Sequence, residues 1–172
     1  MIDESSTTVD DIDEIPAAKG AGKKVVCLIV EGADKGQKFE VVQGSCRALG
    51  RSLDEAERTK LLSANEAVVT LDDFSKKLVF SYVAKHFGKK ESAVGAADFA
   101  GFQREPDFVL KDKSISRLHA MIFFGETGVG VLDLVSKNGT FVNGIEVESK
   151  MLKAGDLITV GGSKIRFEGI HP

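Results

Sequence analysis

Hydroxyls, cations and amides are concentrated in two short segments in the second half of the chain. The first segment supplies the Ser116 hydroxyl and the Arg117 guanidinium, and the second supplies the Lys137 ammonium and the Asn138 amide. Cations and hydroxyls donate hydrogen bonds to oxyanions, and an amide side chain both donates to and accepts from a peptide backbone. These residue types therefore indicate a site for an anionic group carried on a peptide.

Each polar segment borders a stretch that is typical of a β-strand. Residues 119–124 and 129–134 are rich in β-branched and aromatic side chains, as half-buried strands are. We therefore expect the polar groups on loops at one end of a sheet. Two Asn-Gly pairs, at Asn138 and Asn143, add a turn signal because both residue types tolerate positive φ. Either pair taken alone is better explained by an ordinary hairpin turn.

The polar motifs occur in a fixed order along the chain. In that order they are Gly50-Arg51-Ser52, Ser116-x-x-His119, Asn138-Gly139-Thr140 and Asn143-Gly144. This ordered set, with its strand spacing, resembles the forkhead-associated (FHA) family, whose members bind phosphothreonine peptides. The resemblance covers residues 25–52 and 107–167. It implies an FHA-like β-sandwich that carries a phosphothreonine-peptide site on its loops.

The resemblance also implies a role for each motif residue. The expected phosphothreonine-binding residues are Arg51, Ser116, Arg117, Lys137 and Asn138, of which Asn138 holds the peptide backbone. The expected loop-structuring residues are Gly50, His119, Gly139, Thr140, Asn143 and Gly144. Because a phosphothreonine carries about −1.5 to −2 charges at neutral pH, several charge-assisted donors are needed to hold it. A catalytic role for His119 would need a nucleophile and an orienting acid, which the sequence does not supply.

Short strands separated by turns predict a mainly β fold, an antiparallel β-sandwich, even without the resemblance. We expect strands at 25–30, 39–42, 46–50, 108–110, 119–124, 129–134, 140–142, 145–147, 156–160 and 164–167. The strand at 46–50 places Arg51 at its exit. With its length of 172 residues, the chain has room for one domain with an elaboration.

One long segment departs from the FHA pattern. The family usually has a short loop between its Gly-Arg pair and its Ser-x-x-His motif, whereas about 65 positions separate Arg51 from Ser116. The insertion, at about 53–104, is predicted to be helical in its first two thirds, with helix starts at Ser52/Glu55 and Thr70/Asp73. Residues 76–87 also fit a strand, and 88–104 is expected to be a loop. The insertion is interpreted either as a helical cap on the sandwich or as a partner or dimerisation surface.

Residues 1–24 form an acidic tail with too little apolar surface to offset the entropy of ordering. Removing residues 1–22 takes away six acids and one base, which changes the formal net charge from −3 to +2 and is compatible with an anionic ligand. Thr7 and Thr8 are candidate phosphorylation sites for a Ser/Thr protein kinase. A phosphorylated tail is expected to occupy the cleft in cis or in trans; the alternative is an inert, solubilising tail.

Composition and spacing argue against several other classes of protein. The hydrophobic fraction of 42% and charged fraction of 28% are ordinary for a globular domain. We expect a cytoplasmic protein without a membrane partner, because the sequence shows no membrane-length apolar run and no signal-peptide pattern. Cys27 and Cys46 are expected to be reduced core thiols, although a disulfide between them is conceivable. No metal is expected, because no Cys/His cluster has metal-ligand spacing. No cofactor and no nucleic-acid partner are expected either.

No enzyme motif is complete in the sequence. A Walker phosphate loop is missing, and Asp98-Phe99-Ala100 resembles a kinase motif without a catalytic loop to accompany it. We therefore interpret the chain as a regulatory phosphopeptide-binding module of a bacterial signalling protein. Its output is expected in an attached or recruited domain, such as a C-terminal diguanylate cyclase that makes cyclic di-GMP. The alternative is a phosphate-independent FHA-like scaffold for protein assembly.

Overall fold

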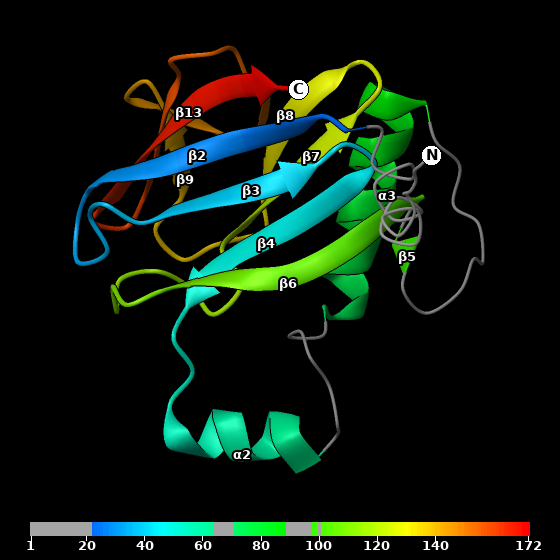
Figure 1. Ribbon diagram of the computed structural model, residues 1–172. Helices are drawn as coiled ribbons and strands as arrows, with labels where there is room; N and C mark the ends of the chain where they lie inside the picture. The colour runs from blue at the N-terminus through cyan, green and yellow to red at the C-terminus, as the bar shows by residue number, and fades with distance from the viewer. Residues whose placement is uncertain (1–21, 64–70, 89–97, 100) are drawn as a thin grey trace, which may run out of the picture.

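The computed structural model describes residues 22–63, 71–88, 98–99 and 101–172, which form two packed six-stranded sheets (Figure 1). The first sheet contains β2 (Lys24–Glu31), β3 (Lys38–Val42), β9 (Thr140–Val142), β10 (Ile145–Val147), β12 (Leu157–Val160) and β13 (Ser163–His171), in the order β10-β9-β12-β13-β2-β3. The second contains β4 (Ser45–Arg51), β5 (Asp98–Phe99), β6 (Phe102–Leu110), β7 (Ala120–Gly125), β8 (Gly128–Asp133) and β11 (Ser149–Met151), in the order β11-β8-β7-β4-β6-β5. The predicted mainly β sandwich is confirmed.

The second sheet is mixed rather than purely antiparallel. Strands β4 and β6 pair in parallel, with Arg51 opposite Leu110, whereas β4 and β7 pair antiparallel. Parallel neighbours cannot be joined by a tight hairpin and need a long crossover connection. The segment between β4 and β6 is that crossover, and most of the predicted insertion falls within it.

The crossover carries two helices, α2 (Glu55–Ser63) and α3 (Asp73–Phe87). The helical prediction for 76–87 is confirmed, and its strand alternative is wrong. The predicted loop is wrong at its end: β6 already begins at Phe102, whose buried side chain packs beneath α3, and β5 pairs with it. Residues 89–97 and 100 lie outside the described residues.

Both predicted helix starts are wrong by about two residues. The Ser52 N–H donates to Leu110 O at 2.8 Å and prolongs the strand pairing, so the helix cannot begin there. Instead Asp54 and Glu57 form a capping box, in which the Glu57 N–H donates to Asp54 Oδ1 at 2.8 Å and the Asp54 N–H donates to Glu57 Oε1 at 3.0 Å. Asp72 caps α3 by accepting from Ser75 N at 2.7 Å, and Thr70 lies outside the described residues.

Apolar side chains form one core between the sheets and a second core beneath α3. Strand β7 serves both, because Ile122 and Phe124 face the first while Met121 and Phe123 face the second. This explains why β7 is apolar without alternation, as strands buried on both faces are. Helix α3 covers the outer face of the second sheet with buried Val79, Tyr82 and Val83, as the cap interpretation of the insertion expects.

The two cysteines are free and buried, as predicted. Cys27 lies in the core between the sheets and Cys46 in the core beneath α3. Burial raises the pKa of each thiol to about 12. Neither helix in the described part of the chain has the length and apolar character needed to cross a membrane. The predicted tail sites Thr7 and Thr8 lie outside the described residues.

Candidate anion-binding site

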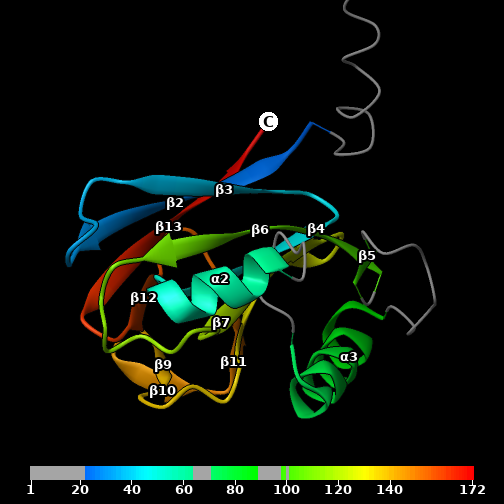
Figure 2. The ribbon, with the colours of Figure 1, turned by 90° about the horizontal axis from the view of Figure 1, so that it is seen from below.

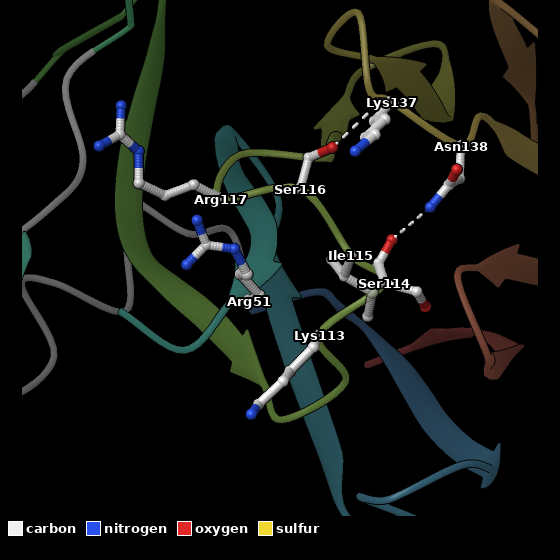
Figure 3. A pocket seen from close by; sticks show the side chains of 8 residues that line it. All are labelled: Arg51, Lys113, Ser114, Ile115, Ser116, Arg117, Lys137 and Asn138. Carbon is white, nitrogen blue, oxygen red and sulfur yellow. Dashed lines mark hydrogen bonds between the residues drawn. The ribbon is translucent and has the colours of Figure 1, made fainter. Parts of the chain in front are cut away.

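A cleft of about 420 Å³ lies at the end of the sandwich where β4 and β6 finish. Its lining residues are Arg51, Lys113, Ser114, Ile115, Ser116, Arg117, Lys137 and Asn138 (Figure 3). They come from the last residue of β4, from the β6–β7 loop and from the β8–β9 loop. The fold thus brings all five predicted phosphothreonine-binding residues to one place, although Arg51 precedes the long crossover and the others follow it.

The lining side chains carry four cations, those of Arg51, Lys113, Arg117 and Lys137, and no carboxylate. Ser116 Oγ accepts a hydrogen bond from the Lys137 backbone N–H at 3.0 Å, so its own O–H can be donated to a ligand oxygen. The cleft therefore presents charged and neutral donors to an anion. Lys113 was missed in the sequence, where a lysine in a loop of mixed charge carries no specific signal.

Asn138 has a structural contact as well as a place in the cleft. Its Nδ2 donates to the Ser114 backbone oxygen at 2.8 Å and ties the β8–β9 loop to the β6–β7 loop (Figure 3). One amide hydrogen and the Oδ1 acceptor remain for a peptide backbone. Asn138 can therefore fix the two loops and hold a ligand at the same time.

His119 is fully buried and connects the same two loops. Its Nδ1 accepts from the Ser116 N–H at 3.1 Å, so its Nε2 carries the proton and donates to Gly139 O, 2.8 Å away. Burial lowers the pKa of His119, and the imidazole is accordingly neutral near pH 7. Its hydrogen bonds hold Ser116 in place, and its ring does not line the cleft.

Asp133, the last residue of β8, organises the β8–β9 loop. Its carboxylate accepts from Ser136 Oγ at 2.6 Å, from Ser136 N at 3.1 Å and from Thr140 Oγ1 at 2.7 Å. Ser136 Oγ in turn accepts from the Gly139 N–H at 2.9 Å. This network fixes the backbone on both sides of Lys137 and Asn138. Thr140 belongs to it, whereas Asp133 and Ser136 were not singled out from the sequence.

Gly50 lets strand β4 and the β6–β7 loop approach each other closely. A Cβ atom at this position would lie 1.9 Å from the Arg117 carbonyl oxygen. The Arg51 N–H donates to Ser116 O at 3.1 Å and holds the loop in that position. The glycine of the Gly-Arg pair is thus required by backbone contact rather than by an unusual φ.

Asn143 and Gly144 form the β9–β10 turn, with φ angles of 52° and 85°. Asn143 Nδ2 donates to Asp156 Oδ1 at 3.0 Å, and Asn143 Oδ1 accepts from the Leu157 N–H at 2.9 Å. These bonds attach the turn to the start of β12. Both residues order this turn and lie outside the cleft lining.

Glu57 of α2 reaches two cations of the cleft. Its Oε1 and Oε2 accept from Arg51 Nη1 and Nη2 at 3.0 and 3.2 Å, and its Oε2 lies 3.7 Å from Arg117 Nη1. The hydrogen bond from Arg51 lowers the pKa of Glu57 to about 2. Sequence reasoning missed this residue because it assigned the helix start to Ser52/Glu55. The Asp54-x-x-Glu57 spacing was the available signal.

Comparison with known proteins identifies the domain. Residues 94–161 match the family model of the FHA domain. Residues 94–161 therefore carry the sequence signature of an FHA domain. The matched segment ends just after β12, and Arg51 of the cleft precedes it.

Two of the curated proteins similar to this chain are named as an inhibitor and a regulator. The oxoglutarate dehydrogenase inhibitor of Corynebacterium efficiens is 38% identical over 68 residues, which are 40% of this chain and 48% of that protein. The glycogen accumulation regulator GarA of Mycobacterium tuberculosis is 35% identical over 68 residues, which are 40% of this chain and 42% of GarA. The match thus spans about half the length of these relatives.

The FHA fold extends beyond the segment that matches in sequence. A solved FHA domain from work on phosphothreonine-dependent FHA interactions aligns with a TM-score of 0.50 and 21% identity, over 87% of this chain and 98% of that structure. At this identity the likeness concerns the fold. It includes strands on both sides of the crossover, because 87% of the chain is more than the part that follows β4.

Proposed function

We propose that this chain binds phosphothreonine peptides through the cleft and so reads the activity of a Ser/Thr protein kinase. The observation that supports the proposal is the convergence of five donor residues on one cleft: Arg51, Ser116, Arg117, Lys137 and Asn138. A phosphate offers three acceptor oxygens and about two negative charges. Charge-assisted hydrogen bonds of this kind contribute roughly 1.5 to 3 kcal/mol each.

Preorganisation of the donors supports a binding role. The hydrogen bonds of His119 and Asp133 fix the two loops, and Asn138 joins them. A ligand therefore meets donors whose backbone is already ordered, which reduces the entropy lost on binding. The cations also give the cleft an electrostatic preference for anions.

The protein's own tail is a candidate ligand, through phosphorylated Thr7 or Thr8. About 17 positions separate Thr8 from Val25, so an extended tail reaches up to about 55 Å. This exceeds the ~15 Å radius of gyration of a domain of this size. Tethering raises the effective concentration of the peptide to roughly millimolar, so even a weak sequence can bind, in cis or on a second copy.

The output of the module stays a prediction. A regulatory module acts through an attached or recruited domain, and the sequence predicts one such as a C-terminal diguanylate cyclase, whose product would be cyclic di-GMP. The cytoplasm, where a Ser/Thr protein kinase would meet the tail, is likewise the predicted location. A longer reading frame that encodes a catalytic domain would support this predicted output.

A phosphate-independent scaffold is the second candidate. Two large apolar side chains are exposed: Phe74 on α3 is 66% exposed, and Val135 in the β8–β9 loop is 59% exposed. Both line a second cleft of about 590 Å³, and apolar surface of this kind marks protein–protein contacts. Self-association that survives Arg51→Ala would favour this function.

The test is fluorescence anisotropy with phosphothreonine peptides, including 3–15 of the tail with Thr7 or Thr8 phosphorylated, and their unphosphorylated forms. We expect binding that requires the phosphate and that Arg51→Ala weakens at least about tenfold, from the loss of charge-assisted bonds. The matched control is Arg166→Ala, since Arg166 also pairs with a carboxylate but lies on β13, away from the cleft lining. Equal binding of phosphorylated and unphosphorylated peptides would refute a phosphothreonine reader.

A further inference from the structure

Glu57 occupies the hydrogen-bonding ends of the arginine that the proposed function needs most. Both terminal nitrogens of Arg51 donate to the two Glu57 oxygens, at 3.0 and 3.2 Å. This parallel, two-bond geometry is how guanidinium groups also bind phosphate. Arg117 adds a longer contact to the same carboxylate, at 3.7 Å. A phosphate that binds this Nη1/Nη2 edge with two parallel bonds must therefore replace Glu57.

In the part of α2 whose side chains the structure describes, the Glu57 carboxylate makes the contact with the sandwich. Helix α2 lies beyond the β4 end of the sandwich in Figure 1 and across that end in Figure 2. Between Glu55 and Lys60, where the structure describes the side chains of α2, Glu57 is the one residue that is not exposed. The helix start itself is held by the Asp54–Glu57 capping box. In this part of α2 no apolar burial opposes its release.

We infer that Glu57 is a built-in competitor for the ligand, which closes the cleft by pairing with Arg51 and Arg117 until an anion displaces it. The inference rests on the proposed function of the cleft and concerns its regulation. A site that is open for only a fraction of the time binds with an affinity reduced by that fraction. Every anion that needs Arg51 therefore binds more weakly by the same factor.

The position of Glu57 in the chain makes the competition effective. Glu57 follows Arg51 by six positions, on a helix that starts directly after the strand. Its carboxylate is therefore always close to the guanidinium, at a high effective concentration. The Arg51 hydrogen bond also lowers the pKa of Glu57 to about 2, so the competitor is ionised whenever a phosphothreonine is doubly charged. A ligand must bring more negative charge or more acceptor oxygens than Glu57 to displace it.

The test compares the full chain with Glu57→Gln and the matched control Glu55→Gln. Glutamine at 57 keeps the capping box, because Gln serves at this position as Glu does. Glu55 lies on the same helix and is exposed, so its substitution removes the same charge without touching Arg51. Calorimetry is run with two probes, a phosphothreonine peptide and inorganic phosphate.

We expect Glu57→Gln to bind both probes about tenfold more tightly than the native chain, as for a cleft that is open about one tenth of the time. Glu55→Gln should change either affinity less than about twofold. Saturating phosphate should also accelerate amide exchange in α2 of the native chain and leave α3 unchanged. Unchanged or weaker phosphate binding in Glu57→Gln would overturn the inference. Weaker binding would identify Glu57 as a residue that orients Arg51.

Inorganic phosphate separates this inference from the proposed function. If Glu57→Gln gains affinity for phosphate while no phosphothreonine peptide binds any form of the chain, the competitor stands and the peptide-reading function fails. If phosphopeptides bind the native chain but Glu57→Gln shows no gain with either probe, the function stands and the competitor fails.

Discussion

Helices α2 and α3 come from the same crossover and begin in the same way, yet different forces attach them to the sandwich. Each has an aspartate as N-cap, Asp54 and Asp72. Helix α3 then buries Val79, Tyr82 and Val83 against the second sheet. Helix α2 instead places Glu57 on Arg51.

The difference assigns the two helices different tasks. Buried aliphatic and aromatic side chains contribute roughly 1.5 to 3 kcal/mol each, so α3 is part of the folded core. A partly exposed ion pair contributes only about 0 to 1 kcal/mol, and the Arg51 and Glu57 side chains are 30% and 22% exposed. An element held in this way can leave without unfolding the domain. A helix beside a binding site can thus respond to ligand only when it is not part of the core.

The largest expected effect is on α3. Tyr82→Ala removes a buried ring that lies 5.4 Å from the ring of Phe123 and 5.9 Å from that of Phe87, centre to centre. We expect the free energy of unfolding to fall by about 3 kcal/mol, from lost burial and the cavity that remains. Urea denaturation measures it. Phe74→Ala, on the same helix but 66% exposed, should change it by less than about 0.5 kcal/mol; equal effects of the two substitutions would contradict the assignment of α3 to the core.

The two helices should differ in the rates at which their backbone amides exchange with solvent. Amides of α3 are expected to exchange only through global unfolding, because α3 shares its core with β7 and β6. Amides of α2 should open locally and exchange at least about a hundredfold faster, because the described part of α2 buries no apolar side chain. Mass spectrometry of peptides from 55–63 and 73–87 gives the comparison. Similar protection in both would show that α2 belongs to the core.

The two capping aspartates provide a matched pair of substitutions. Asp72→Ala should lower the midpoint of thermal unfolding by roughly 3 °C, because loss of the cap weakens a helix on which the core depends. Asp54→Ala removes an equivalent cap from α2 and should leave the midpoint within about 1 °C. Calorimetry of both variants measures this. A drop of equal size with Asp54→Ala would mean that α2 contributes to global stability.

The smallest expected effect is the pH dependence of α2 attachment. Since the folded chain holds the pKa of Glu57 near 2, below its ordinary value of 4.5, the contact is complete above pH 4.5 and is lost as the pH falls towards about 2. Carbon NMR of the Glu57 carboxyl group follows this titration. In Arg51→Ala the pKa should return towards 4.5, because its first cause, the Arg51 hydrogen bond, is gone. A native value near 4.5 would argue against the ion pair.

Sequence reasoning identified the β-sandwich, the helices of the crossover and the five cleft residues, because each has a local signal. Alternation and turn residues mark strands, and the FHA-like motif order marks the loops. It placed both helix starts wrongly because several Ser, Thr, Asp and Glu residues precede each helix, at spacings that fit more than one cap. Only the backbone hydrogen bond from Ser52 to Leu110 excludes a helix that starts at Ser52.

The sequence by itself determined which residue types are available to bind an anion and that a long segment separates Arg51 from the rest of them. The tertiary structure decided how they meet. Parallel pairing of β4 with β6 brings Arg51 beside the β6–β7 loop, and Gly50 permits that approach. The same crossover delivers Glu57 to Arg51, since the strand end and the helix start are adjacent in the chain. Such contacts depend on which strand the chain pairs with after the crossover. Local residue patterns do not determine that pairing.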